Sequence, residues 1–186
     1  KRMALDSTST ALFLENGKFR PIGSTWRAPG LANVLRRIAE RGRDGFYTGE
    51  TADLIVASMK AGGGIISKAD LASYQPAWRS PVEFGYRGHR VVSMPPVSSG
   101  GLTLALILGI VEGKDLASLG WRTPASIHVL AEAERRAFAR RNTLLGDPAF
   151  VKIPAASFLS RDTAAALRAE IGGKSSGSPP APTPKE

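Results

Sequence analysis

Apolar residues in the first third of the chain recur at intervals of three and four, the spacing that places side chains on one face of a helix. In residues 28–43 these positions are Leu31, Val34, Leu35 and Ile38. In residues 49–60 they are Ala52, Ile55, Val56 and Met59. We expect two amphipathic helices here, the first stopped by Gly42 and the second by Gly62-Gly63-Gly64. Ser67 and Asp70 have the spacing of a capping box and predict a short helix through Tyr74.

The pattern changes to alternation beyond residue 80. Val82, Phe84 and Tyr86 alternate with polar or small residues. A turn at residues 87–89 separates them from a second extended segment, residues 90–94. Two short alternating segments around a glycine-containing turn predict a β-hairpin.

Three further helices are predicted in the second half. The apolar run 102–111 predicts a buried helix, and residues 160–171 an amphipathic one. Thr123-Pro124 is a helix start, with the helix running to about Asn142. The inward stripe we expect on that helix is Ile127, Leu130, Ala131, Glu134 and Phe138, with Arg141 at its far end. Its two charged members need partners if they are buried.

Composition excludes several kinds of site. The 186 residues, 42% hydrophobic and 22% charged, favour one globular unit or part of one. There are no cysteines, which excludes disulfides, cysteine-bound metals and thiol nucleophiles. The two histidines, His89 and His128, make a Ser-His-Asp triad or a histidine metal site improbable, and His128 is expected to be a partly exposed packing residue. We therefore expect no metal, no cofactor and no catalytic residue within this chain.

The net charge of +9 raises the possibility of a nucleic-acid partner. The basic residues are scattered, usually with acids nearby, and no aromatic-interleaved basic motif occurs. Solvated helix faces are therefore the favoured explanation, with a basic nucleic-acid binder kept as an alternative. We expect no membrane span, because the longest apolar run is about half the required length. Residues 1–6 lack the apolar run of a signal peptide and suggest an internal cut, whereas residues 172–186 predict a Gly/Ser/Pro-rich flexible tail.

The segment between the hairpin and the buried helix is the candidate site. Two prolines, Pro95 and Pro96, precede Ser98, Ser99, Gly100 and Gly101. Exposed amides and serine hydroxyls at a helix start could hold an anion or a carboxylate. A capped helix start within a core is the more frequent meaning of such a segment, and both interpretations stay open. Neither serine has a candidate base nearby in the sequence, so we expect Ser98, Ser99, Gly100 and Gly101 to support an active site without reacting.

Taken in order, these motifs resemble the gamma-glutamyltranspeptidase family over nearly the whole ordered chain. The matching pieces are Asp44-Gly45-Phe46-Tyr47-Thr48-Gly49, Gly63-Gly64-Ile65-Ile66, Asp70-Leu71-Ala72-Ser73-Tyr74, Arg79-Ser80-Pro81-Val82, Ser93-Met94-Pro95-Pro96-Val97-Ser98-Ser99-Gly100-Gly101, Ile127-His128-Val129-Leu130-Ala131-Glu132-Ala133 and Gly146-Asp147-Pro148-Ala149-Phe150-Val151. Each piece alone is common, but their order and spacing are specific. One departure is Arg140-Arg141, which stands where the family commonly has Asp-Arg.

The resemblance implies an α/β fold, part of an αββα N-terminal nucleophile hydrolase sandwich, mostly helical with a few short strands. It implies that residues 1–171 are the C-terminal part of a large subunit and that residues 172–186 precede an autocleavage site. The nucleophile would be a threonine of the small subunit, activated by its own α-amine and forming an acyl-enzyme with glutathione or another γ-glutamyl substrate. Thr183 lacks the sequence context of the family's nucleophile, so we do not assign it as the nucleophile.

For this chain alone, the resemblance implies that it pairs with another polypeptide and has no enzymatic activity by itself. The partner would be the small subunit cut from the same precursor, and the compartment periplasmic or extracellular. The parent would be a γ-glutamyltransferase or glutathione hydrolase. The alternatives are a cephalosporin-acylase-like amidohydrolase of the same family and, from another class, a noncatalytic helical interaction module.

Overall fold

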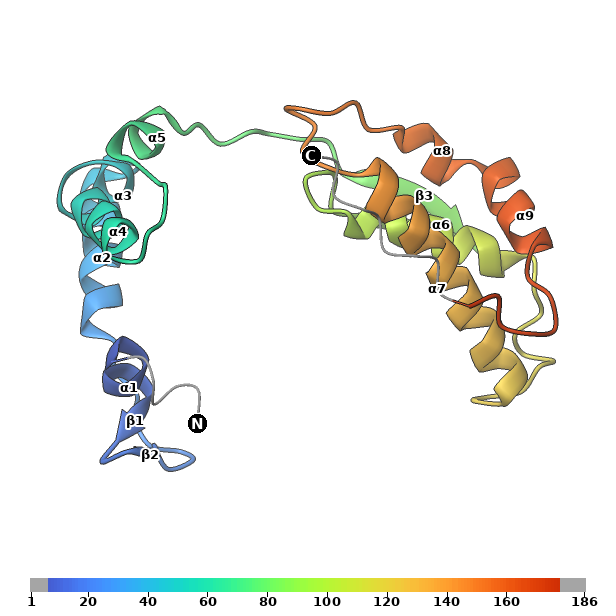
Figure 1. Ribbon diagram of the computed structural model, residues 1–186, viewed down its shortest axis with the longest axis horizontal. Helices are drawn as coiled ribbons and strands as arrows, with labels where there is room; N and C mark the ends of the chain where they lie inside the picture. Colours follow the sequence, from blue (N-terminus) through green and yellow to red (C-terminus); the bar gives the residue numbers. More distant parts are fainter. Residues whose placement is uncertain (1–6, 178–186) are drawn as a thin grey trace. The chain divides into compact units, whose positions relative to one another are not determined.

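The computed structural model describes residues 7–177 and divides the chain into two compact units, Lys1–Ala77 and Trp78–Glu186 (Figure 1). Residues 1–6 and 178–186 lie outside the described residues, and with them Thr183 and most of the predicted tail. Each unit has its own internal packing. The two are therefore described separately.

The first unit is mainly helical. It contains α1 (Ser7–Phe13), the two-residue strands β1 (Leu14–Glu15) and β2 (Lys18–Phe19), α2 (Pro29–Arg41), α3 (Asp44–Tyr47), α4 (Gly49–Ala61) and α5 (Lys68–Ser73). β1 pairs antiparallel with β2. The predicted helices at 28–43 and 49–60 are confirmed as α2 and α4. The capping box is confirmed as well, with Ser67 accepting from the Asp70 amide and the Asp70 carboxylate accepting from the Ser67 amide.

Helices α2, α3 and α4 meet through polar and backbone contacts. Arg37 of α2 forms an ion pair with Glu50 of α4 and donates to the Thr51 hydroxyl. At Gly45 of α3, an added Cβ would lie 2.1 Å from the Arg37 carbonyl oxygen, so only glycine permits this close approach. The apolar stripe of α2 stays exposed, with 56% of the surface of Leu35 accessible. The predicted apolar stripe of α2 is therefore present, but no other element in the described part of this unit packs over it.

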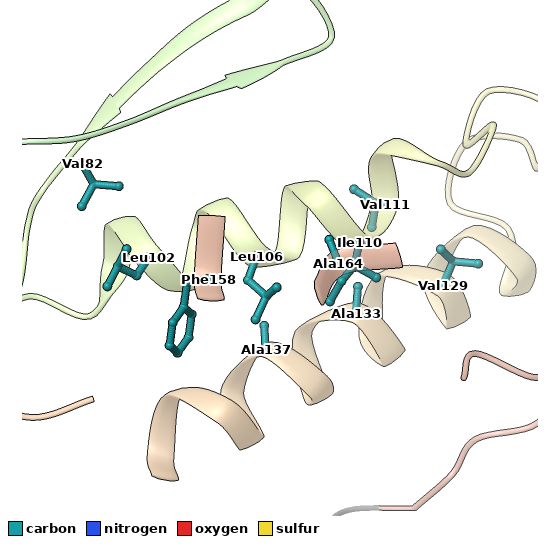
Figure 2. Packing of buried hydrophobic residues seen from close by; sticks show 10 residues of the cluster. All are labelled: Val82, Leu102, Leu106, Ile110, Val111, Val129, Ala133, Ala137, Phe158 and Ala164. Atoms are coloured by element: carbon teal, nitrogen blue, oxygen red, sulfur yellow. The ribbon is translucent and has the colours of Figure 1, made fainter. Parts of the chain in front are cut away.

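The second unit is built around one buried helix. It contains β3 (Val82–Tyr86), β4 (His89–Ser93), α6 (Gly100–Glu112), α7 (Pro124–Leu144), α8 (Ala155–Leu159) and α9 (Arg161–Ala169). Helix α6 lies between the β3–β4 hairpin and helices α7, α8 and α9. The fully buried side chains of α6 include Leu102, Leu106 and Ile110. Figure 2 shows Leu106 pointing toward Ala137 of α7, with Phe158 of α8 alongside. The predicted buried helix is therefore the core of this unit.

The predicted hairpin is confirmed, with Val82 opposite Ser93 and Phe84 opposite Val91. Its turn is tighter than expected, because Arg87 and Gly88 both have positive φ and β4 already begins at His89. Two consecutive residues of positive φ are typical of the two-residue hairpin turn that matches the twist of the strands.

The buried face of α7 differs from the predicted stripe. Thr123 caps the helix, accepting from the Ser126 amide at 3.2 Å, and the helix runs two residues past the predicted end. The buried positions are Ser126, Val129, Glu132, Ala133, Arg136 and Ala137. The predicted residues Ile127, Leu130, Ala131, Glu134 and Phe138 are all exposed, and Arg141 is half-buried. The prediction was wrong because α7 has two apolar faces, and the small residues Val129, Ala133 and Ala137 are the ones that permit close packing on α6.

The last helix ends two residues earlier than predicted. It was predicted over residues 160–171, but α9 is capped by Ser160 and closes at Ala169. Residues 172–177, at the start of the predicted tail, lie against α7 and bond to it. The rest of the tail is outside the described residues, so its flexibility stays a prediction.

Candidate functional site

The candidate site forms where β4 passes into α6. Gly101, in the first turn of α6, is buried against the end of the strand. A Cβ added there would lie 2.3 Å from the Met94 carbonyl oxygen and 3.3 Å from the Ser93 Cβ. Gly100, one residue earlier, is exposed, and its nearest neighbour would be the Ser98 hydroxyl at an ordinary 3.5 Å. The close approach of strand and helix therefore requires glycine at position 101 but not at position 100.

Ser98 and Ser99 have different partners. The Ser98 hydroxyl accepts a local bond from the Gly100 amide at 3.3 Å. The Ser99 hydroxyl accepts from Nε of Arg141, on α7, at 3.0 Å. Ser99 therefore connects the start of α6 to a helix more than forty residues away in sequence.

Three segments distant in sequence line one hollow of about 410 Å³ beside Ser99. They are the serine-containing junction, the end of α7 and the Gly-Asp-Pro turn, and their lining residues are Val97, Ser99, Arg141, Asn142, Leu145, Gly146 and Asp147. Arg141 also donates to the Asn142 side chain at 2.9 Å, and the Asp147 carboxylate accepts from the Ala149 amide at 2.9 Å. The sequence motifs at 93–101 and 146–151 thus meet in the fold.

The hollow is suited to holding polar groups and lacks a reactive pair. Neither His89 nor His128 lines it, so Ser99 has no base beside it. Among residues 7–177, no group of three histidine or acidic side chains is placed to hold a metal ion. Ser98, Ser99, Gly100 and Gly101 therefore form the junction between β4 and α6, and in the described part of the chain none of them has the neighbouring base that a nucleophile needs.

A second polar cluster lies on the buried face of α7. Glu132 is 2% exposed and pairs with Arg135 at 2.9 Å and with Arg136, which is 7% exposed. Hydrogen bonds from Arg135, and next from Arg136, hold the pKa of the Glu132 carboxyl well below its usual range. The same bond raises the pKa of Arg135. Sequence analysis placed the inward charges at Glu134 and Arg141 instead, although Glu132 followed by arginines three and four residues later was a usable signal.

The amino-acid sequence matches the family model described as gamma-glutamyltranspeptidase over residues 1–185. The chain belongs to the gamma-glutamyltranspeptidase family. It is 47% identical, over 92% of its length, to the glutathione hydrolase proenzyme of Pseudomonas sp. (strain A14). It also superimposes on the gamma-glutamyltranspeptidase of Helicobacter pylori with a TM-score of 0.82 and 38% identity over 97% of the chain. The mixed α/β fold implied by the resemblance, part of an N-terminal nucleophile hydrolase, is confirmed.

Members of the gamma-glutamyltranspeptidase family are longer than this chain. It spans 30% of the Pseudomonas relative and 51% of the Helicobacter pylori chain. The family likeness extends to the cephalosporin acylase of Bacillus halodurans, with a TM-score of 0.73 and 35% identity over 88% of this chain. Within the described residues no helix is long and apolar enough to cross a membrane.

Arg140, the position at which the resemblance suggested a departure from the family, bonds weakly. Its Nη2 donates to the Ser157 hydroxyl at 3.4 Å, and its buried Nε has no hydrogen-bond partner among residues 7–177. No ion pair of Arg140 occurs in the same part of the chain. The neighbouring Arg141 contacts Ser99, whereas Arg140 does not line the hollow beside Ser99.

Proposed function

We propose that this chain is the C-terminal part of the large subunit of a γ-glutamyltransferase or glutathione hydrolase. The 47% identity to a glutathione hydrolase proenzyme supports this, because the word proenzyme describes a precursor that is processed. In the proposed enzyme a threonine of the small subunit attacks the γ-glutamyl carbonyl, with its own α-amine as base. The acyl group then passes to water or to an amine. A periplasmic or extracellular location belongs to the same proposal.

The role proposed for this chain is to shape the active site without reacting. The observation that carries it is the meeting of the 93–101 and 146–151 motifs at the hollow joined by Ser99 and Arg141. N-terminal nucleophile sites form at strand ends, and the junction from Pro95 to Gly101 leaves the end of β4. In this proposal the residues of the junction position the backbone around the site. The nucleophile, the base and the group that binds the substrate carboxylate come from other parts of the parent protein.

The isolated chain is expected to have no γ-glutamyl hydrolase activity. The reason is that the threonine and its amine, which together form the nucleophile and base, are assigned to another segment of the parent. Incubation with a chromogenic γ-glutamyl anilide should give release no faster than buffer. The intact parent, assayed beside it, should release product, and release by the isolated chain in proportion to its concentration would refute the proposal.

Ser99→Ala in the intact parent is expected to lower kcat/KM by less than about tenfold. The hydroxyl accepts from the charged Arg141 guanidinium, and such a bond contributes about 1.5–3 kcal/mol to stability. Because Ser99 acts on the reaction only by positioning the start of α6, we expect only part of this to appear in kcat/KM. Ser98→Ala is the matched control, since that hydroxyl bonds only locally to Gly100 and should change kcat/KM little. Loss of turnover beyond about a thousandfold in Ser99→Ala, with normal folding and processing, would instead indicate a direct catalytic role.

A cephalosporin-acylase-like activity is the second candidate, favoured by the 35% identity to the Bacillus halodurans acylase. Both activities would use the same acyl-enzyme chemistry and differ in the acyl group accepted. Comparing kcat/KM of the intact parent for a γ-glutamyl anilide and for a glutaryl amide separates them. A larger value for the glutaryl amide would assign the protein to the acylase branch.

A further inference from the structure

The cluster on α7 holds the segment that follows α9. Glu132 accepts from the Ser176 amide at 3.3 Å and from the Ser176 hydroxyl at 2.8 Å. Arg136 donates to the Glu170 carbonyl oxygen at 2.7 Å and to the Ser176 hydroxyl at 3.3 Å. One turn earlier on α7, Nε2 of His128 lies 2.7 Å from the Gly172 carbonyl oxygen. Residues 170–176 are thus attached to α7 at both ends and at one point between.

These polar contacts are what holds the segment in place. Residues 172–177 are glycine, lysine and serine, without an apolar side chain to bury, and all six are exposed. A segment of this composition does not order itself. Glu132, in contrast, is a fully enclosed carboxylate, and burial of a charge is favourable only when its partners are complete. Ser176 supplies two of those partners, so the segment and the buried charge depend on each other.

We propose that Glu132, Arg136 and Ser176 form a clasp that positions the chain for precursor cleavage. This inference rests on the proposed function, in which the cleavage site follows this segment. The clasp moves the start of the free tether from Gly172, which His128 holds, to Ser176. Glu132 and Arg136 are positioning residues in this role, because they act on the cleaved bond only through the chain they hold.

The expected size of the effect follows from tether length. Release of Ser176 adds the segment from Gly172 to Ser176 to the free chain, because His128 still holds Gly172. Effective concentration falls roughly as the −3/2 power of tether length, so four more residues on a tether of about ten lower it by a factor of about 1.6. The chain also loses the fixed direction in which it leaves α7, and this lowers the effective concentration further.

The test compares Ser176→Ala with Ser175→Ala in the intact precursor. Ser176→Ala removes the hydroxyl contacts to Glu132 and Arg136 but leaves the ion pair within α7. Within residues 7–177 the Ser175 hydroxyl accepts from the Gly177 amide and does not contact Glu132 or Arg136, so Ser175→Ala is a control that spares the clasp. The first-order rate of conversion of precursor to two polypeptides is followed by gel electrophoresis, together with the melting temperature of the precursor and kcat/KM of the processed enzyme.

We expect Ser176→Ala to slow cleavage at least about twofold relative to Ser175→Ala, with mature kcat/KM unchanged. The melting temperature should fall by no more than a few degrees, because Glu132 loses one hydrogen bond and keeps the Ser176 amide and both arginines. Ser176→Pro, which removes the amide donor as well, should slow cleavage further. Equal rates in Ser176→Ala and Ser175→Ala would overturn the clasp. So would slower cleavage that disappears when both precursors are compared at the same interval below their melting temperatures, because the contact would then act on folding. If the wild-type precursor is not cut at all, the proposed function itself fails.

Discussion

Gly101→Ala in the intact precursor is expected to lower the free energy of unfolding by more than about 3 kcal/mol and to prevent processing. The added methyl would lie 2.3 Å from the Met94 carbonyl oxygen, and that oxygen belongs to backbone at the end of β4. Overpacking against movable side chains costs about 1–3 kcal/mol, and backbone has less room to move. Since proteins of this size are stable by only about 5–15 kcal/mol, most of the variant should be recovered unfolded or uncut.

Gly100→Ala is the matched control for this substitution. It places the same methyl group one residue earlier in the same helical turn, where the nearest atom is the Ser98 hydroxyl at 3.5 Å. We expect its unfolding free energy to stay within about 0.5 kcal/mol of the wild type. Measurement is by denaturant unfolding and by the fraction of precursor cut. Normal processing of Gly101→Ala would contradict the close approach at this junction and, with it, the supporting role proposed for residues 95–101.

Glu132→Gln is expected to lower the free energy of unfolding by about 3 kcal/mol at pH 7. The amide has nearly the shape of the carboxylate but no charge, so Arg136 loses its buried counter-ion and keeps only the exposed Glu170 carboxylate, 3.4 Å from its Nε. Breaking a buried ion pair from one side costs about 3–5 kcal/mol. Glu134→Gln, two residues along α7 and exposed, should change the unfolding free energy by less than about 0.5 kcal/mol. Equal stability of the two variants would contradict the burial of this cluster.

The loss of stability caused by Glu132→Gln should become smaller as the pH is lowered. The pKa of Glu132 is held below its usual range by Arg135 and Arg136, whereas in the unfolded chain it is about 4.3. A carboxyl with a depressed folded pKa stabilises fully above the unfolded pKa and loses that contribution as pH falls toward the folded one. The difference between wild type and Glu132→Gln should therefore be constant from pH 7 to about pH 5 and shrink below about pH 4. Denaturant unfolding of both proteins across this range measures it.

Local sequence signals were sufficient for most of the helices and for the hairpin. The caps at Ser67, Thr123 and Ser160 are formed by side chains that accept from the amide three residues later, so the sequence contains all that is needed. The apolar run of α6 was long enough to indicate burial on all sides. The convergence of Ser99 with Arg141 could not be derived from spacing, since it depends on how α6 packs against α7.

The orientation of α7 shows where sequence reasoning fails. The larger apolar residues Ile127, Leu130 and Phe138 define the more hydrophobic face, and that face was predicted to turn inward. The structure places alanines against α6 instead, because small side chains let the two helix backbones come close. Glu132 and Arg136 follow from the same rotation of the helix. A residue pattern alone cannot rank two apolar faces of one helix, because the choice depends on which elements pack against each face.

The outer face of α7, with 55% of Ile127 and 48% of Phe138 accessible, has a consequence for biosynthesis. The second unit has its own buried core around α6, so it can fold on the ribosome before later codons are translated. In the proposed precursor, the apolar outer face of α7 then stays exposed on the nascent chain until a segment that packs on it has been synthesised. At about 5–20 residues per second, each hundred residues of delay leaves it open for roughly 5–20 seconds. During that time the exposed apolar face of α7 is available to chaperones or to other nascent chains, so we expect expression of the precursor to improve with added chaperones.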